Sequence, residues 1–207
     1  MKLLNLLLRR SSTRSTQEAS GLHACIELEG RHSYGMEHFS IFHFGDGHKL
    51  RIGSFNSIAP GQVVFLGGNH RLDWITTYPF GHLHIDKFPS GLARGSGHPV
   101  SKGDVVIEND TWIGFGCTIM SGVRICSGSV VAAKSVVTRD VPPYSVVAGN
   151  PARIVKYRFN DETIESLLRL RWWDLDDFKI NRIAPLLQQA PSPEQINEIL
   201  STISQKS

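Results

Sequence analysis

IENDTW, IGFGCT, IMSGVR, ICSGSV, VAAKSV and VTRDVP are the six consecutive hexads of residues 107–142. Each hexad begins with a β-branched aliphatic residue: Ile107, Ile113, Ile119, Ile125, Val131 and Val137. At the chain's own frequency of isoleucine and valine, the odds of such a series by chance are roughly one in 10⁵. A helix needs apolar residues every three to four positions and a strand needs them every second position, so a period of six fits neither. The repeat predicts a solenoid in which short strands and corners alternate.

The other hexad positions agree with this geometry. In a parallel β-helix of hexapeptide repeats, each hexad forms one short strand and one corner, three hexads close a coil, and coils stack ~4.8 Å apart. The fourth residue must turn, and it is mostly a type that enters the left-handed region cheaply: Asp110, Gly116, Gly122, Gly128, Lys134 and Asp140. The fifth residue points into a crowded corner and is small or β-branched: Thr111, Cys117, Val123, Ser129, Ser135 and Val141. The predicted fold class is therefore an all-β solenoid.

The repeat is interrupted once. Ile52, Ile58 and Val64 form an earlier block with the same period, but the spacing from Val64 to Ile107 is not a multiple of six. We therefore expect an excursion loop over residues 70–102. Insertions in repeat proteins gather on one face, which is often the binding face. This loop is the first place to look for chemistry.

The boundaries of the repeat divide the chain into three segments. They are an N-terminal tail over residues 1–20, a β-helix domain with its excursion over 21–157, and a helical region over 158–207. Pro142-Pro143 ends the register because proline removes a strand hydrogen bond, and Asn150-Pro151 marks a second turn.

Two helices are predicted at the C-terminal end. The first begins at Asn160 or Asp161, where the spacing of apolar residues becomes helical. The second follows Ser192, with Pro193 in the first turn and Gln195 as the capping-box residue. Such helices cover the unpaired edge that an open solenoid exposes.

Charge and hydropathy exclude several partners. A net charge of +3 with 20% charged residues gives no strong footprint for nucleic acid. The short basic group Arg9, Arg10 and Arg14 is typical of a solvated tail. The leucine-rich segment 3–8 is too short to span a bilayer, and its flanking charges are wrong for a signal peptide.

Cysteine and histidine spacing predicts no metal site. Cys25, Cys117 and Cys126 form no Cys-x-x-Cys pair, so we interpret them as buried thiols of a protein in the reducing cytoplasm. The histidines in the second half of the loop, His82, His84 and His98, match no ligand pattern either.

His70 is the candidate functional residue of the loop. It stands where the next hexad should begin with an aliphatic residue, so an imidazole replaces a core side chain as the chain leaves the solenoid. A hydrogen-bonded structural histidine explains that placement as well, because the chain has nine histidines. Asp73 is a candidate orienting group for His70, although an aspartate three residues after a loop histidine is often a turn former.

Several motifs, taken in order, resemble the xenobiotic acetyltransferase family, which includes type B chloramphenicol and streptogramin acetyltransferases. They are Ile52-Gly53-Ser54, Gly68-Asn69-His70-Arg71, Tyr78-Pro79-Phe80, Asn109-Asp110-Thr111-Trp112-Ile113-Gly114, Val141-Pro142-Pro143-Tyr144, Gly149-Asn150-Pro151-Ala152 and Arg171-Trp172-Trp173-Asp174. The similarity covers roughly residues 30–175. One hexad alone is a weak signal, whereas the ordered set is specific.

The resemblance implies a left-handed parallel β-helix, a homotrimer, and acetyl-CoA in a groove between neighbouring subunits. The handedness rests on the family alone, because it runs against the general right-handed crossover rule. His70 matches the family's catalytic histidine. As a neutral imidazole it would take the proton of an acceptor hydroxyl as that oxygen attacks the thioester, by direct transfer without a covalent acyl-enzyme.

The resemblance also implies binding residues. For the cofactor they are Trp112, Gly114, Gly116, Cys117, Ala133, Lys134 and Arg153, whose small side chains admit a pantetheine arm and whose cations could meet phosphates. For the acceptor they are Tyr34, Asn69, Trp74 and Tyr78, since aromatic rings stack on a sugar or a drug ring alike. Turning, packing and solvation explain many of these residues as well. Trp172 and Trp173 are predicted to anchor the C-terminal helix.

The leading hypothesis is acetyl-CoA-dependent O-acetylation of a hydroxyl on a small molecule or sugar. An antibiotic acetyltransferase of the chloramphenicol or streptogramin type stays open, as does an amino-sugar N-acetyltransferase, because the same base serves an amine. The non-enzymatic alternative is a β-helical interaction scaffold. The complete Asn69-His70-Arg71 setting argues against that alternative.

Overall fold

The structure is a computed structural model that describes residues 23–45, 47–80, 86–88, 97 and 100–204. The predicted N-terminal tail, with Arg9, Arg10 and Arg14, lies outside the described residues. So do three of the histidines considered for a metal, His82, His84 and His98, and most of the second half of the predicted excursion.

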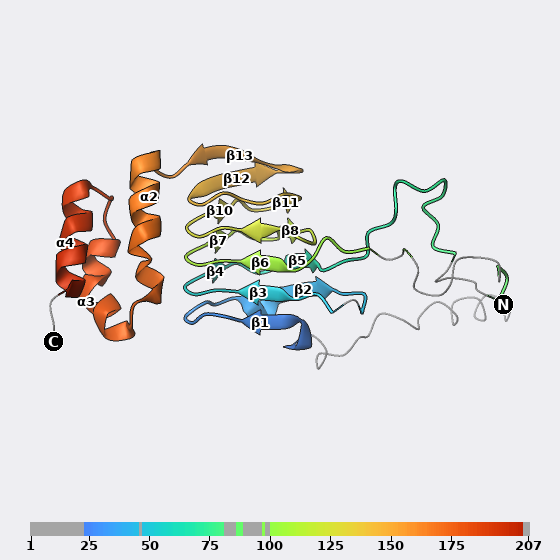
Figure 1. The fold of residues 1–207 in the computed structure, drawn as a ribbon, viewed down its shortest axis with the longest axis horizontal. Helices are drawn as coiled ribbons and strands as arrows, with labels where there is room; N and C mark the ends of the chain where they lie inside the picture. The colour runs from blue at the N-terminus through green and yellow to red at the C-terminus, as the bar shows by residue number, and fades with distance from the viewer. Residues whose placement is uncertain (1–22, 46, 81–85, 89–96, 98–99, 205–207) are drawn as a thin grey trace, which may run out of the picture.

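Three sheets of short strands carry the repeats (Figure 1). Sheet A contains β1 (Ile26–Leu28), β3 (Leu50–Ile52), β6 (Val105–Ile107) and β9 (Arg124–Ile125). Sheet B contains β4 (Ser57–Ile58), β7 (Trp112–Ile113), β10 (Val130–Val131), β12 (Ser145–Gly149) and β13 (Ala152–Tyr157). Sheet C contains β2 (Phe39–Phe42), β5 (Gln62–Phe65), β8 (Thr118–Ile119) and β11 (Val136–Val137). We call this assembly the three-sheet stack.

Pairing within the stack follows the hexad repeat. The neighbouring strands of each sheet are parallel, except that β13 runs antiparallel to β12. From β6 onward a strand pairs with the strand three hexads later, so that Val106 lies opposite Arg124 and Trp112 lies opposite Val130. The parallel sheets and the three-hexad step are those that the repeat predicts.

The first residue of every hexad is buried inside the stack. None of these side chains is more than 2% exposed: Ile52, Ile58, Val64, Ile107, Ile113, Ile119, Ile125, Val131 and Val137. The residues predicted to fill the corners are buried as well, with no more than 2% exposure: Thr111, Cys117, Val123, Ser129, Ser135 and Val141. Each coil of three hexads forms one rung of the stack. Burying β-branched side chains at each rung removes apolar area from water along the whole stack, and this burial stabilises it.

The fourth hexad residue makes the turn at five of the six corners. Asp110, Gly116, Gly122, Gly128 and Lys134 have φ between 53° and 76°, the left-handed region predicted for them. Asp140 is the exception. Its carboxylate accepts a hydrogen bond from the Arg124 backbone N–H at 2.8 Å, just before the prolines end the register.

The excursion interrupts the chain without interrupting the stack. Ile107 lies directly opposite Ile52 in sheet A, which is the place that residue 70 would take if the hexads continued. The chain therefore leaves after β5, and β6 resumes at the next rung. Figure 1 shows the excursion projecting from the side of the stack opposite the helices.

The stack continues past the hexads at its C-terminal end. β12 and β13 were not predicted, because Pro142-Pro143 ends the period of six. β12 nevertheless pairs with β10, with Val146 opposite Val130, and the hairpin to β13 turns at the predicted Asn150-Pro151. β13 thereby pairs with an edge that would otherwise be open.

Three α-helices lie beside the stack: α2 (Asp161–Leu170), α3 (Asp177–Leu187) and α4 (Pro193–Ser204). The Asn160 side chain caps α2 by accepting from the Thr163 N–H at 2.9 Å, as predicted. Ser192 Oγ accepts from the Gln195 N–H at 3.2 Å, but the predicted capping box is wrong. The Gln195 amide donates to the Leu186 carbonyl instead, at 2.7 Å, because α3 packs against this end of α4. α3 itself was not predicted.

A small apolar core of Leu170, Ile183 and Ile199 joins the three helices. Trp172 anchors them to the stack, since its ring lies 4.8 Å from that of Phe55, and Trp173 is buried with 2% exposure. Among the described residues, no helix is long and apolar enough to cross a membrane.

Candidate active site

The stack has three corners, and the candidate residues lie at different ones. The A–B corner, residues 108–111 and their counterparts on other rungs, faces the helices. The B–C corner comprises residues 114–117 and their counterparts, and the C–A corner comprises residues 120–123 with theirs. The excursion leaves from the C–A corner.

The neck of the excursion, residues 66–70 and 100–104, is closed by hydrogen bonds. Asn69 and Val100 exchange backbone hydrogen bonds of 3.0 and 2.8 Å. The Asn69 side-chain amide also donates to the Val100 carbonyl at 3.1 Å and to the hydroxyl of buried Ser121 at 2.9 Å. Asn69, a candidate for acceptor binding, thus ties both strands of the neck to the C–A corner.

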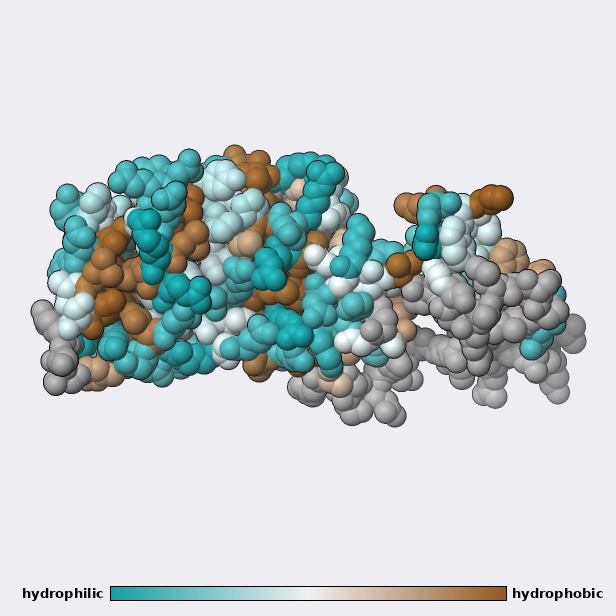
Figure 2. All heavy atoms as spheres, viewed as in Figure 1, coloured by the Kyte–Doolittle hydropathy of each residue, from teal (hydrophilic) through white to brown (hydrophobic). Residues whose placement is uncertain are grey.

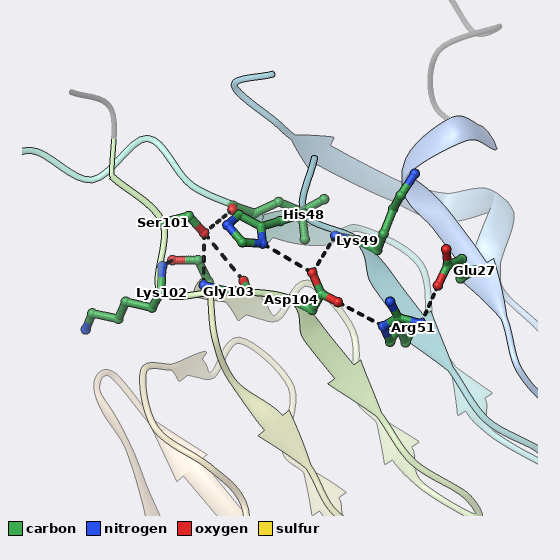
Figure 3. A network of polar contacts seen from close by, with 10 residues as sticks. Glu27, His48, Lys49, Arg51, Ser101, Lys102, Gly103 and Asp104 are labelled. Atoms are coloured by element: carbon green, nitrogen blue, oxygen red, sulfur yellow. Dashed lines mark hydrogen bonds and ion pairs between the residues drawn. The ribbon is translucent and has the colours of Figure 1, made fainter. Parts of the chain in front are cut away.

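A polar network holds the returning strand (Figure 3). The Asp104 carboxylate accepts from the Lys49 backbone N–H at 2.9 Å and from Arg51 Nε at 2.8 Å. The Lys49 N–H is the main cause of the lowered pKa of Asp104, and Arg51 and His48 add to it. Ser101 Oγ donates to the Leu66 carbonyl at 2.6 Å. The neck is therefore fixed on both sides.

His70 is the last residue of the first neck segment and is exposed. Its Nδ1 lies 2.6 Å from the Thr77 carbonyl oxygen. Because a carbonyl only accepts, Nδ1 must carry the proton, and in the neutral ring the basic lone pair then lies on Nε2. This is the tautomer that a general base needs. No sequence signal identified Thr77, because every residue has a carbonyl and only the path of the loop selects this one.

The other loop candidates pack within the excursion. Asp73 forms a two-point ion pair with Arg71, so its predicted role in orienting His70 stays a prediction, and Thr77 is the orienting group that the structure adds. Trp74 lies under Arg71, whose guanidinium carbon is 5.3 Å from the ring centroid, and it packs closely on Gly97. Tyr78 packs on Phe80 with 4.7 Å between ring centroids.

Most of the cofactor candidates meet at the B–C corner. A Cβ on Gly114 would lie 2.6 Å from the Ala133 nitrogen, and one on Gly116 would lie 2.7 Å from Lys134 Nζ. The Lys134 ammonium is exposed and sits 4.4 Å from the centroid of the Phe115 ring. The two glycines are therefore required by packing within the chain, and the groups that this corner exposes to a ligand are Ala133 and the Lys134 ammonium.

Two further cofactor candidates differ in what they can contact. Cys117 is fully buried, its thiol donates to the Gly114 carbonyl at 3.1 Å and its backbone N–H donates to Gln62 Oε1 at 3.0 Å, so it offers nothing to a ligand. Arg153 lies on β13 opposite Ala148, next to the turn whose Gly149 N–H donates to Ser135 Oγ at 3.2 Å. Arg153 is exposed above the same corner.

Tyr34 and Trp112 belong to one outward row of sheet B. Tyr34 bridges to Ser57, and Ser57 pairs with Trp112. Both aromatic side chains are exposed, at 63% and 58%. A groove of about 600 Å³ runs beside Trp112 and is lined by Ser57, Thr111, Val130, Val146, Lys156, Asp110, Arg158 and Phe159.

The candidates thus form two main groups at opposite ends of the sheet C strands. The loop group, with His70, lies at the C–A corner, and the cofactor group lies at the B–C corner, next to the sheet B row. Within the chain the structure brings together the members of each group. The sequence predicted the members of both groups but not this separation.

The cysteines are free thiols with little nucleophilic character. Burial raises the pKa of Cys117, and burial raises the pKa of Cys126 to about 11. A thiolate is the reactive form, so both shifts disfavour covalent catalysis. Cys126 is half-buried rather than buried as predicted, because it stands at the second hexad position, which alternates outward. Within the described ranges, no cluster of histidine, cysteine and carboxylate side chains could hold a metal ion.

Comparison with known proteins gives both a sequence family and individual relatives. Residues 104–139 match the family described as "Bacterial transferase hexapeptide (six repeats)". The chain is 42% identical over 163 residues to a "Probable macrolide acetyltransferase" of Lysinibacillus sphaericus, and the match covers 73% of this chain and 84% of that protein. It is 41% identical to a chloramphenicol acetyltransferase of Klebsiella aerogenes, over 69% of this chain and 67% of that one. It is 42% identical to a virginiamycin A acetyltransferase of Staphylococcus aureus, over 68% of this chain and 64% of that one.

Proposed function

Because the chain belongs to the xenobiotic acetyltransferase family of hexapeptide-repeat enzymes, we propose that it transfers an acetyl group from acetyl-CoA to a hydroxyl of a small-molecule acceptor. The observation that carries the proposal is the hydrogen bond from His70 Nδ1 to the Thr77 carbonyl at 2.6 Å. It supports a basic Nε2 on an exposed residue at the excursion, where a general base of this reaction is needed.

His70 acts as the base in a direct transfer. Its Nε2 takes the proton of the acceptor hydroxyl while the hydroxyl oxygen forms a bond to the thioester carbonyl carbon. The carbon–sulfur bond then breaks, and the leaving thiolate of coenzyme A takes the proton from the imidazolium. Thr77 stabilises the imidazolium through its carbonyl dipole. The raised pKa values of Cys117 and Cys126 favour this route over an acyl-enzyme.

Acetyl-CoA would lie along the B–C corner. The small exposed side chain of Ala133 leaves room for a pantetheine arm, and Lys134 and Arg153 would pair with its phosphates. Tyr34 and Trp112 supply exposed ring faces for the acceptor or the cofactor beside the groove of sheet B. These assignments rest on the exposure of Ala133, the two cations and the two rings.

We infer a left-handed β-helix for the stack and a homotrimer for the protein. The outward rows support the trimer. The outward row of sheet A is mainly charged, with Glu27, Arg51 and Arg124 beside one apolar residue, Val106. The rows of sheets B and C are mainly apolar or small: Tyr34, Ser57, Trp112, Val130 and Val146 on B, before Lys156 on β13, and Ser40, Val63, Thr118 and Val136 on C. Apolar outward faces favour subunit contacts. In such a trimer the His70 group of one subunit would meet the B–C corner of its neighbour.

The acceptor is a hydroxylated small molecule, and antibiotics head the panel because three relatives carry macrolide, chloramphenicol and virginiamycin A in their names. The compartment assumed is the reducing cytoplasm, since all three cysteines are free thiols. A panel of a macrolide, chloramphenicol, virginiamycin and hydroxylated sugars, assayed by thiol release from acetyl-CoA, identifies the acceptor. Acetylation of amino sugars alone would instead establish an N-acetyltransferase.

Replacement of His70 tests the mechanism. His70→Ala should lower kcat by about 10²–10⁴-fold, with little change in the affinity for acetyl-CoA, because only the proton transfer is lost. His32→Asn removes an exposed imidazole at the A–B corner, away from both the neck and the B–C corner, and asparagine tolerates the left-handed backbone, so kcat should be unchanged. Near wild-type turnover by His70→Ala would overturn the assignment of the base.

A further inference from the structure

The A–B corner differs from the others in its turning residues. His32, Phe55, Asp110, Gly128 and Tyr144 all have φ between 52° and 71°. They stack in one column. Each backbone N–H from Phe55 onward donates, at 2.9–3.1 Å, to a carbonyl of the rung below, and that carbonyl belongs to the residue just before the turning residue there. Four of the five are not glycine, although L residues adopt this region at a cost. The side chains of this column therefore have a role that glycine cannot fill.

The column leaves a gap in its middle. Phe55 and Tyr144 are large, whereas Asp110 has a short side chain and Gly128 has none. With rungs ~4.8 Å apart, the Phe55 and Tyr144 rungs lie about 14 Å apart. The Tyr144 ring leans over Gly128, so closely that a Cβ there would lie 2.4 Å from it. Two aromatic walls thus flank a recess with Asp110 at its base.

The helices turn this recess into a cavity of about 390 Å³. Trp172 and residues of α2, α3 and α4 form its roof, chiefly Leu167, Ile180, Ala184 and Ile199. Figure 2 shows hydrophobic atoms at the surface among the helices at this end of the molecule. The volume falls in the range of small-molecule pockets, and an apolar wall with a few polar groups is their usual lining.

Two opposite charges stand at the base of the cavity. Arg158 lies 3.9 Å from the Asp110 carboxylate, donates to the Gly128 carbonyl at 2.6 Å, and has the Tyr144 and Phe159 rings 5.3 and 5.1 Å from its guanidinium carbon. Because these two charges lie side by side, an ionic ligand finds no net opposite charge here to offset the loss of its hydration. An uncharged ligand avoids that cost, and its hydroxyl can donate to the Asp110 carboxylate.

We propose that this cavity is a second small-molecule site, which binds an uncharged ring compound with one hydroxyl or amide group. The cavity is separate from His70, because the helices and the excursion lie on opposite sides of the stack. It adjoins the groove beside Trp112, with which it shares Asp110, Arg158 and Phe159. The ring packs between Phe55 and Tyr144 under the helices, and the polar group binds Asp110. Binding at this cavity does not require the acetyl-transfer reaction.

Three probes of matched size test the charge preference in the full-length protein. Phenethyl alcohol is neutral, phenethylammonium is cationic and hydrocinnamate is anionic. Isothermal titration calorimetry should show saturable binding of the alcohol, at least about tenfold tighter than that of either ion. Absence of saturable binding of the alcohol, or equal binding of an ion, would overturn the proposal.

Variants on α3 locate the binding. Ala184→Phe fills the cavity and should weaken binding of phenethyl alcohol by at least about tenfold. Asn181→Phe places the same side chain on the exposed face of the same helix and should have no effect. Ala184→Leu is the milder substitution if circular dichroism shows that Ala184→Phe does not fold. Unchanged binding in the filled variant contradicts this location.

The His70→Ala variant separates the two sites. It should bind phenethyl alcohol as the wild type does, even though acetyl transfer is lost. If His70→Ala lost the alcohol as well, the ligand would lie in the acetyl-transfer site and the second site would be wrong. If His70→Ala kept both activities, only the catalytic proposal would fail.

Discussion

Lys134 shows how a single residue can combine a conformational cost with a binding role. It is the only non-glycine among the turning residues described at the B–C corner, Gly61, Gly116 and Lys134, and it has φ 63°. Such a conformation costs an L residue about 1–2 kcal/mol. The exposed ammonium over Phe115 recovers about 0.5–1 kcal/mol of this. The contact does not offset the whole conformational cost, and the uncompensated part favours a binding role for this cation.

The Lys134→Gly variant separates stability from cofactor binding. Glycine adopts the left-handed backbone without strain, which stabilises the variant, but it also removes the contact with Phe115, which destabilises it. The two effects nearly cancel, so the free energy of unfolding should change by less than about 1 kcal/mol. The affinity for coenzyme A should fall, because the phosphates lose a cation. Urea denaturation and calorimetry measure the two quantities. Lys134→Arg keeps the charge and should retain affinity; unchanged affinity in Lys134→Gly contradicts the phosphate contact.

Asp110 makes stability depend on pH. Burial raises its pKa to about 6, although Arg158 opposes the shift. A raised carboxyl pKa favours the protonated form in the folded state, so its contribution to stability is present below the ordinary value and is lost as pH rises through 6. The side chain is 32% exposed, so the loss should be only on the order of 1 kcal/mol.

The Asp110→Asn variant checks this linkage, since asparagine also tolerates the left-handed conformation. Thermal unfolding measured at several values between about pH 4 and 8 should give a flatter profile for the variant than for the wild type. Parallel profiles for the two proteins would show that Asp110 titrates alike in the folded and unfolded states.

At the residue scale, the sequence located His70 because a break in a strict period is visible without any structure. It did not locate Thr77, whose contribution is a backbone carbonyl placed by the loop path. It placed Asn69 in the right loop, but the hydrogen bonds to Val100 and Ser121 come from segments far away in the sequence. Contacts of this kind depend on tertiary structure rather than on residue type.

Among the elements, the neck decides how firmly the loop is held. Asn69→Ala should lower kcat more than it raises KM. The variant loses the hydrogen bonds that hold the backbone next to His70, so the imidazole is less well positioned, while the surface that binds the acceptor is unchanged. Ser121→Ala removes the partner hydroxyl of the same hydrogen bond. In a double-mutant cycle the two losses should be strongly non-additive, since they break one interaction. A pure rise in KM, additive with Ser121→Ala, would instead assign Asn69 to acceptor binding.

Elements with a strong period were predicted well, and elements without one were not. The hexads identified β6 to β11 because each strand ends at the buried first residue of a hexad. β12 was missed because its pairing with β10 is made by the backbone after the hexads end. α3 was missed because Pro185 lies inside it and its cap, Asp176, follows directly on a 3-10 turn.

For the whole molecule, the separation of the two residue groups predicts a site shared between subunits. His70→Ala and Lys134→Glu should each be nearly inactive alone. In each mixed trimer one interface, about a third of the total, would combine an intact His70 with an intact neighbouring Lys134. Co-expression of the two variants with different tags, followed by tandem purification, should therefore restore activity. Mixed oligomers without activity would place the complete site within one subunit.

The closed neck allows the excursion loop to be replaced while the stack stays the same. Asn69 and Val100 lie side by side, so the two ends of the loop leave the stack as closely as the ends of a hairpin. Doubling the length of a loop with fixed ends costs only about 0.6 kcal/mol, and no rung needs to shift its register. Loops of different length and composition can therefore replace one another between Asn69 and Val100 while the stack is unchanged. New acceptor specificities can arise there by recombination without any compensating change in the stack.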